Sequence, residues 1–212
     1  MLELYQDTED LGLGPDSRFN FDCLPGLACF NECCRRTMVL LSPYDAWRLK
    51  GAMGISSGEF LRRHTIRMPE ERSRLPLIFL KPPRGQEQGC PLVNEEGCTV
   101  YEHRPAVCRL FPITQGSSLT EEGMADYYYC RRLDYCQGFD QAREWTVAAW
   151  KAAQGFDQYD AWRGDWLEML LRQGERGPGA VQLQDLFYLS LYDQDNFRQF
   201  VFDSAFLRVH DL

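Results

Sequence analysis

Nine cysteines occur in this chain of 212 residues, and four of them fall within twelve residues near its start. The clustered four are Cys23, Cys29, Cys33 and Cys34, and the other five are Cys90, Cys98, Cys108, Cys130 and Cys136. Thiolates bind zinc, Cu(I) and iron–sulfur clusters in preference to hard cations. The spacing, with two cysteines adjacent in the chain, therefore predicts a metal centre built from sulfur ligands.

A disulfide scaffold is the competing interpretation, and the start of the chain argues against it. The first residues are acidic and lack the basic stretch and apolar run of a secretory signal. No apolar stretch reaches the length of about 18 residues that a membrane span needs. We therefore expect a bacterial, cytoplasmic protein, whose compartment keeps thiols reduced and so favours metal over disulfides. An odd number of cysteines would also leave one outside any pairing.

Charge is distributed unevenly along the chain, whose net charge is −8. Both ends are acidic, whereas residues 23–109 are net positive and hold seven of the nine cysteines. Guanidinium groups beside thiolates offset their charge and lower their pKa values. We therefore expect Arg104 and Arg109, which flank Cys108, to support the site rather than react. The overall acidity and the lack of a long basic stripe argue against nucleic-acid binding.

Regular structure is predicted to be short around the cysteines. Residues 1–18 are expected to lie loosely on the surface, and 19–36, with Pro25 and Gly26, are expected to form a loop. Ser42-Pro43 and Ser56 are typical helix starts, with Gly54 ending the first helix. A turn or short helix that starts at Arg104-Pro105 is expected to carry Cys108. Short strands are predicted at 37–41, 75–81, 99–101 and 124–129.

The composition changes after Cys136, because no cysteine follows and tryptophans recur at helical spacing. Helices are predicted at 143–154, 157–173, 181–192 and 197–207, with the Trp and Phe stripe as their core. The fold class is therefore α+β, with a loop-rich cysteine core, short strands and a helical C-terminal half. The expected organisation is an acidic segment 1–18, a cysteine-rich metal-binding domain 19–140, and a helical extension 141–212 packed on it.

Four blocks of the sequence carry a resemblance to a known family. The most specific is Gly97 to Arg109, with the order Gly-Cys-Thr-Val-Tyr-Glu-His-Arg-Pro-Ala-Val-Cys-Arg. The Cys33-Cys34 pair and Cys90-Pro91 precede it, and Cys136 follows, ahead of a Trp-Thr-Val helix start. Over roughly 19–150 the chain resembles the YkgJ-like cysteine-cluster family, whose members carry a zinc- or iron-chelating domain.

The resemblance implies metal binding and a set of eight ligands, but no particular reaction. The implied ligands are Cys23, Cys29, Cys33, Cys34, Cys90, Cys98, Cys108 and Cys136. Cys130 lies outside the usual set, as either a ninth free thiol or a substitute ligand. Gln137 stands where the family usually has proline.

Eight cysteines suit two four-coordinate sites, or one site with bystanders. Zinc takes four tetrahedral ligands in a structural site, and a [4Fe–4S] cluster also takes four thiolates. The spacing does not separate the two metals, and we favour the cluster. Adjacent side chains on extended backbone point opposite ways, so Cys33 and Cys34 would serve different metals or opposite sides of one cluster.

Recognisable catalytic motifs are lacking, which leaves open whether the protein is an enzyme. His64, His103 and His210 are the only histidines, and none belongs to a nucleophile–base motif. We expect an iron–sulfur protein, with [4Fe–4S] as the cofactor and a redox role for it. The alternative is Zn²⁺, held structurally or carried as cargo, with the acidic helical tail binding a protein partner.

Overall fold

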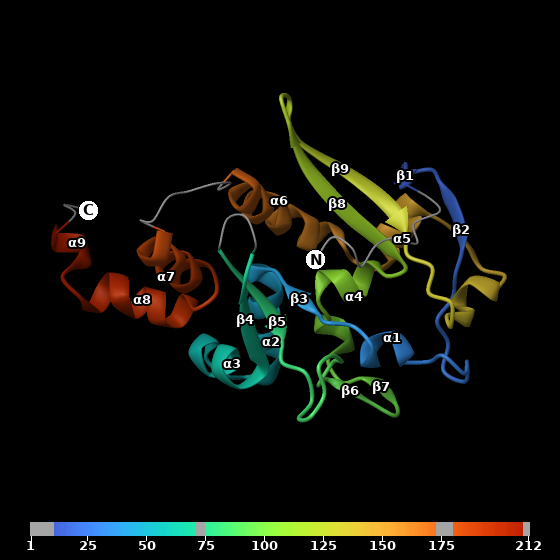
Figure 1. Cartoon of the computed structure of the whole chain (residues 1–212), viewed down its shortest axis with the longest axis horizontal. Coiled ribbons are helices and arrows are strands. Elements are labelled where there is room, and N and C mark those ends of the chain that lie inside the picture. The colour runs from blue at the N-terminus through green and yellow to red at the C-terminus, as the bar shows by residue number, and fades with distance from the viewer. Residues whose placement is uncertain (1–10, 71–74, 173–179, 210–212) are drawn as a thin grey trace.

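The computed structural model describes residues 11–70, 75–172 and 180–209. The fold is α+β: short antiparallel strands form small sheets, and helices cover them and dominate the C-terminal half (Figure 1). The buried apolar residues fall into two cores, and cysteines pack within or against each of them.

The first core lies on a three-stranded antiparallel sheet and the two helices beside it. Its elements are β3 (Leu40–Leu41), β5 (Pro76–Leu80), β4 (Thr65–Pro69), α2 (Pro43–Met53) and α3 (Ser57–His64), with β5 central in the sheet. Ser42 and Asp45 form a reciprocal capping box that starts α2, and Gly54 ends it in the left-handed conformation. Ser56 caps α3 through its side chain, which accepts from Glu59 N.

Two C-terminal helices complete this first core rather than forming one of their own. These are α6 (Asp157–Arg172) and α7 (Ala180–Leu191), which contribute Trp166 and Phe187. Tyr192, just after α7, is buried and donates its hydroxyl to Leu41 O at 3.0 Å. Segments far apart in the sequence therefore close the core together.

The second core joins the N-terminal strands to a long hairpin. Its elements are β1 (Leu11–Leu13), β2 (Arg18–Asn20), β8 (Ile113–Thr120), β9 (Gly123–Cys130), β10 (Glu144–Thr146) and α5 (Val147–Ala153). The ladders run β1–β9–β8 and β10–β2, all antiparallel. Phe19, Phe21 and Trp150 pack edge to face inside, and Trp150 Nε1 donates to Leu110 O at 2.8 Å.

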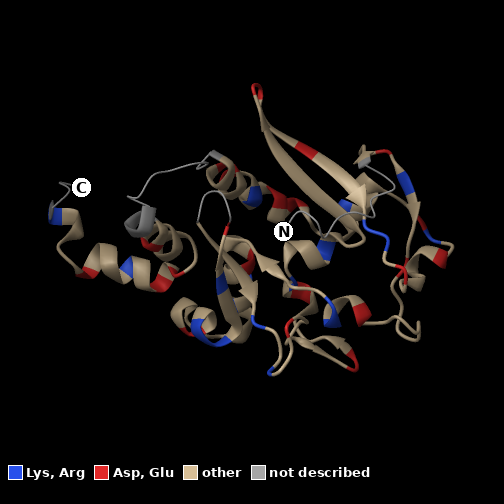
Figure 2. Cartoon of the chain, in the orientation of Figure 1, with Lys and Arg blue, Asp and Glu red and all other residues tan. Residues whose placement is uncertain are grey.

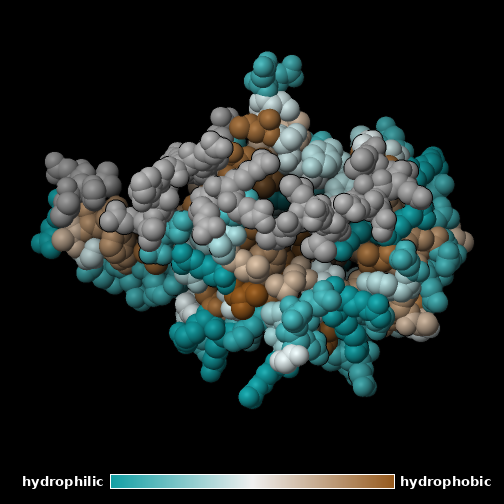
Figure 3. Space-filling view, viewed as in Figure 1, coloured by the Kyte–Doolittle hydropathy of each residue, from teal (hydrophilic) through white to brown (hydrophobic). Residues whose placement is uncertain are grey.

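The last described helices, α8 (Gln194–Asp203) and α9 (Phe206–Val209), attach through polar contacts. Asp195 accepts from Lys50 Nζ at 2.7 Å and from Ser57 N at 2.7 Å, which ties α8 to α2 and α3. Among the described residues, no helix has the length and apolar character needed to cross a membrane. Figure 3 shows hydrophilic residues over most of the visible face, with hydrophobic ones in small areas between them.

Most predicted elements are confirmed, including the capped helices, the strand 75–81, the strand 124–129, the short helix carrying Cys108 and the C-terminal helices. Several expectations are wrong. The predicted helix 143–154 is replaced over Glu144–Thr146 by the strand β10. Residues 11–18 are not loose, because β1 pairs with β9. The predicted strand 99–101 is replaced by β7 (Gly97–Cys98) and a 3-10 turn, η2 (Tyr101–His103). Trp162 is 66% exposed instead of forming core. Residues 1–10 lie outside the described part.

Candidate metal centre

The adjacent cysteines lie on a single helical turn, α1 (Glu32–Arg35). This corrects the expected extended backbone at that position. Asn31 precedes the turn in the left-handed conformation, with φ of 68°, and so redirects the chain into it. Successive side chains on a helix diverge by about 100°. The sulfurs of Cys33 and Cys34 therefore remain neighbours, 4.0 Å apart, instead of pointing opposite ways.

Three cysteines lie near Cys33, two from the segment before α1 and one, Cys136, from far along the chain. Gln137 N donates to Cys29 Sγ at 3.2 Å, and Cys136 also has a side-chain contact with Cys29. Cys23 interacts electrostatically with Cys33, Cys136 and Cys29. We call these four thiols the Cys136 group. The 3-10 turn η3 (Gln137–Asp140) holds them together, because Asp22 N donates to Gly138 O at 3.0 Å.

Three further thiols, Cys90, Cys98 and Cys108, lie near Cys34. Cys90 N donates to Cys34 O at 2.7 Å, which fixes one loop against the helical turn. The electrostatic neighbours of Cys34 include Cys33, Cys108 and Cys90, and those of Cys108 include Cys90, Cys98 and Cys33, so Cys33 lies in range of both sets of thiols. We call Cys34, Cys90, Cys98 and Cys108 the Cys90 group. It draws on α1, the hairpin of β6 (Val93–Asn94) with β7, and α4 (Ala106–Leu110).

The β6–β7 hairpin is held against the segment before α1 by specific contacts. Asn94 Oδ1 accepts from the backbone N–H groups of Glu96 and Gly97, each at 3.0 Å, which forms the turn. Gly97 has φ of 129°, a conformation that side chains disfavour. Asn31 Nδ2 donates to Asn94 O at 3.2 Å. These residues place Cys98 beside α1.

Arg104 and Arg109 are both buried, and their guanidinium groups bond to oxygens rather than to sulfur. Arg104 donates to Tyr101 O at 2.7 Å and to Gln154 Oε1 at 2.5 Å. Arg109 donates to the carbonyl oxygens of Arg104, Gln154 and Glu102. Both side chains thus clamp the 101–109 turn to the C-terminus of α5. Arg104 also interacts with a thiol at longer range, because its positive charge lies within electrostatic range of Cys98.

Cys130 is separated from the two groups by its position in the fold. It ends β9 opposite Ile113, is 3% exposed, and packs in the second core. Its side chain is therefore placed among apolar residues, whereas the other cysteines are partly or fully accessible.

The thiols are neighbours, but they are not drawn into a tight shell. Among the residues that the structure describes, no three His, Cys, Asp or Glu side chains converge closely enough to hold a metal ion. In a tetrahedral zinc site, Zn–S bonds of about 2.3 Å would bring the sulfurs to about 3.8 Å from one another. The donor set is nevertheless soft and comes in fours, which fits zinc or a four-iron cluster in ligand type.

Burial makes most of these thiols harder to ionise. It raises the pKa of Cys23 to about 11 and raises the pKa of Cys90, Cys136 and Cys108. The pKa of Cys33 is lowered to about 7, chiefly by a hydrogen bond from Cys34, whose own pKa rises accordingly. Metal binding would therefore displace protons from most of the site.

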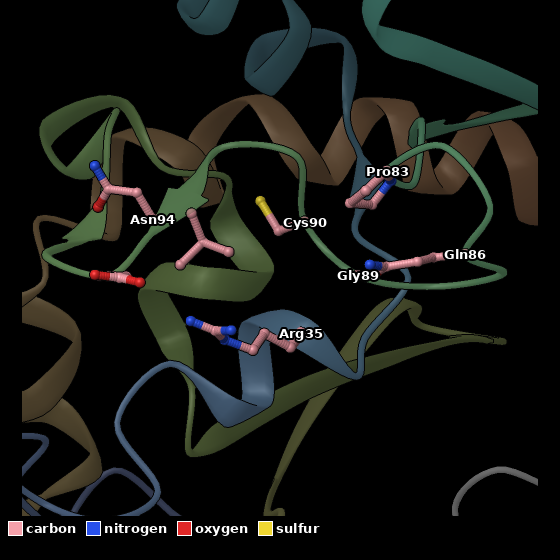
Figure 4. A pocket seen from close by; sticks show the side chains of 8 residues that line it. Arg35, Pro83, Gln86, Gly89, Cys90 and Asn94 are labelled. Carbon is pink, nitrogen blue, oxygen red and sulfur yellow. The ribbon is translucent and has the colours of Figure 1, made fainter.

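A cavity of about 390 Å³ opens beside the Cys90 group (Figure 4). Its lining residues come from α1 and from the loop 83–95, and they are Arg35, Pro83, Gln86, Gly89, Cys90, Val93, Asn94 and Glu95. Figure 2 shows both basic and acidic residues on the elements around α1. The cavity gives small molecules a route to Cys90.

A protein-family model matches residues 22–137, and its family is CxxCxxCC, described as "Putative zinc- or iron-chelating domain". The matched range holds every cysteine of both groups, together with Cys130. No curated protein and no solved structure matches the chain.

Proposed function

Because this chain belongs to the CxxCxxCC family of zinc- or iron-chelating domains, we propose that it is a redox protein that holds a [4Fe–4S] cluster. The family supports the metal-binding character of the chain. The choice of cluster and the redox role are our proposal. The ligands would be cysteines that surround α1.

The observation that carries the proposal is the looseness of the thiol groups. A single zinc ion needs its four ligands within a compact shell, and the described residues include no such set. A four-iron cluster is a larger body with its thiolates farther apart, so neighbouring but separated thiols support it. Ligands from all-cysteine groups, without histidine or carboxylate, also suit a cluster.

A redox role is supported by the position of the thiols near the surface. Cys23 is exposed, and Cys90 borders the cavity beside α1. Electrons could therefore enter or leave by way of a docked donor without crossing a thick protein layer. Arg131, which is within electrostatic range of Cys33, would offset part of the cluster's negative charge. When bound, the cluster would supply one-electron chemistry, and the protein would set its potential.

Anaerobic purification, with elemental analysis and optical and EPR spectra, tests this proposal. We expect iron and acid-labile sulfide, a broad visible absorption that bleaches on reduction, and a paramagnetic reduced state. A colourless protein that retains tightly bound zinc after iron supplementation would overturn it.

A structural zinc protein with a docking tail is the second candidate, and one observation favours it. The α8 helix exposes Phe200 and Phe202, the latter at 66%. Such side chains on an acidic tail would suit a protein partner. Under this candidate, removal of both Phe side chains would abolish partner binding while leaving metal content unchanged.

A further inference from the structure

Asp45 is 1% exposed, which makes it the most deeply buried charged residue among those that the structure describes. We propose that Asp45 is a positioning residue for the metal centre. Its carboxylate holds the start of the short helix α4 and thereby fixes the place of Cys108. The inference rests on the proposed metal-binding function and deepens it, and it applies to an iron–sulfur cluster and to zinc alike.

Helix α4 lacks the local features that would fix its own start. It has five residues, far fewer than a helix needs to be stable alone. Pro105 stands at its N-cap and makes no side-chain hydrogen bond to it. Ala106, the first helical residue, is only 7% exposed, and a buried backbone N–H needs an acceptor. That acceptor must therefore come from another part of the chain.

Asp45 supplies the acceptor from 61 residues away in the sequence. Its Oδ1 accepts from Ala106 N at 2.8 Å. Its Oδ2 accepts from Ser42 N and from Ser42 Oγ, each at 2.8 Å. The bonds to Ser42 hold the carboxylate in one orientation at the start of α2, and this orientation places the other oxygen where α4 begins. One carboxylate is thus the cap of two helices.

The backbone carries this placement from the start of α4 to Cys108. Pro105 O accepts from the N–H groups of Cys108 and Arg109, each at 2.9 Å, so Cys108 lies in the first turn of the helix. The Cys108 side chain packs against the first core, to which α2 contributes Leu49. Asp45 therefore fixes the position of Cys108 relative to α2.

A role in stability alone is the alternative, and Asp195 offers a matched control. Its carboxylate also accepts from a backbone N–H at the start of a helix, namely Ser57 N of α3 at 2.7 Å. It joins α3 to α8, and neither helix carries a cysteine. Loss of the Asp195 carboxylate should therefore weaken the fold without moving a thiol.

The test measures how fast each cysteine is alkylated by iodoacetamide in the full-length protein, purified anaerobically with its metal. Peptide mapping by mass spectrometry gives the rate for each position, and a chelator competition gives the rate of metal release. In Asp45→Ala we expect Cys108 to react about tenfold faster, as befits the loss of a buried hydrogen bond to a charged group, and metal release to accelerate with it. Cys130, in the second core, should keep its rate, and Asp195→Ala should leave Cys108 unchanged.

Two further variants separate the hydrogen bond from the charge and from general damage. In Asp45→Asn the amide oxygen can still accept from Ala106 N while its NH₂ group donates to Ser42 Oγ, so Cys108 should regain nearly wild-type protection. Ala106→Pro removes the donor instead, at the first helical position that proline suits, and should expose Cys108 as Asp45→Ala does. It provides the same reading if Asp45→Ala does not fold.

An unchanged Cys108 rate in Asp45→Ala or in Ala106→Pro would overturn the inference. So would a rise shared equally by all nine cysteines, or an equal rise in Asp195→Ala, because either would mean a general loss of stability. Zinc in place of iron, with Cys108 selectively exposed, would refute the iron–sulfur proposal and support the role of Asp45. Iron that bleaches on reduction, with no selective exposure of Cys108, would do the reverse.

Discussion

The first core and the thiol groups lie side by side but reach order by different means. In the core, Leu41, Leu49 and Ile78 are fully buried, and β5 pairs along its whole length with β4. Around the thiols the elements are only two to five residues long: α1, β6, β7 and α4. Apolar periodicity organises the core, whereas the thiol region buries little apolar surface to offset an ordering cost of roughly 1–2 kcal/mol per residue. Metal–sulfur bonds would supply the difference.

Metal removal should give the largest contrast between the two regions. Structural metal sites contribute on the order of 10 kcal/mol of folding free energy. We expect the metal-free protein to lose amide protection across Cys23–Arg36 and Cys90–Arg109, while β5 and α2 keep theirs. Hydrogen exchange with and without metal measures this. Amide protection that persists in both thiol segments of the metal-free protein would show that metal does not stabilise them.

Leu49→Ala should damage the core and leave the metal in place. Leu49 is fully buried, so the cavity should lower the free energy of unfolding by about 2–5 kcal/mol. Chemical denaturation of the loaded protein measures the loss, and elemental analysis should show unchanged metal. Trp162→Ala, at an exposed aromatic side chain, is the control and should cost far less. Metal loss in Leu49→Ala would mean that the regions do not fold separately.

The two regions are joined at Asp45, which should make stability depend on pH. Its carboxylate accepts from Ser42 N in the core and from Ala106 N beside Cys108, each at 2.8 Å. Burial raises its pKa from 3.8 to about 6. The native state thus binds this proton more tightly than the unfolded chain, so the stabilisation is complete below about pH 4 and lost as pH rises through 6.

The expected change is about 3 kcal/mol in the free energy of unfolding. Asp45→Asn should flatten this dependence between pH 4 and 6, while Asp203→Asn, at an exposed position, should preserve it. Denaturation curves at several pH values give the slope. A slope that is the same in wild-type and Asp45→Asn protein would refute the assignment.

Arg104→Ala should have the smallest effect, and it tests the boundary between the regions. Loss of the buried guanidinium leaves Tyr101 O and Gln154 without their donor, at a cost of about 1–3 kcal/mol. We expect weaker metal retention in a chelator competition, with Arg62→Ala, on the exposed side of α3, as the control. If the metal content and the melting temperature of Arg104→Ala stayed unchanged while the variant no longer bound an acidic ligand, the role of Arg104 would be to bind that ligand instead.

The sequence predicts the core elements well because their signals are local. The Ser42–Asp45 box and Gly54 mark both ends of α2 within a few residues. By contrast, the sequence of β8 does not predict a strand, because it is mostly polar, contains Gly116 and lacks an alternation of apolar and polar residues. The strand forms because it pairs with β9 along its length. Tertiary pairing decides such strands.

In the candidate site, too, local sequence features could be predicted and tertiary contacts could not. The Gly97–Arg109 block and the Cys33-Cys34 pair identify the family from sequence alone. Which cysteines lie near one another could not be predicted, because that depends on α1 being a helical turn and on the return of Cys136 to Cys29 at η3. Cys130 was ambiguous for the same reason, since only the β9 register places it in the second core.

The single turn of α1 also predicts which changes of length the protein tolerates. A residue inserted between Cys33 and Cys34 would rotate Cys34 by about 100° and carry its sulfur away from Cys90. An insertion near Leu24 and Gly26, which are exposed, would lengthen a loop and cost little. We therefore expect homologous chains to vary in the interval between Cys23 and Cys29 and to keep the cysteine pair without a gap.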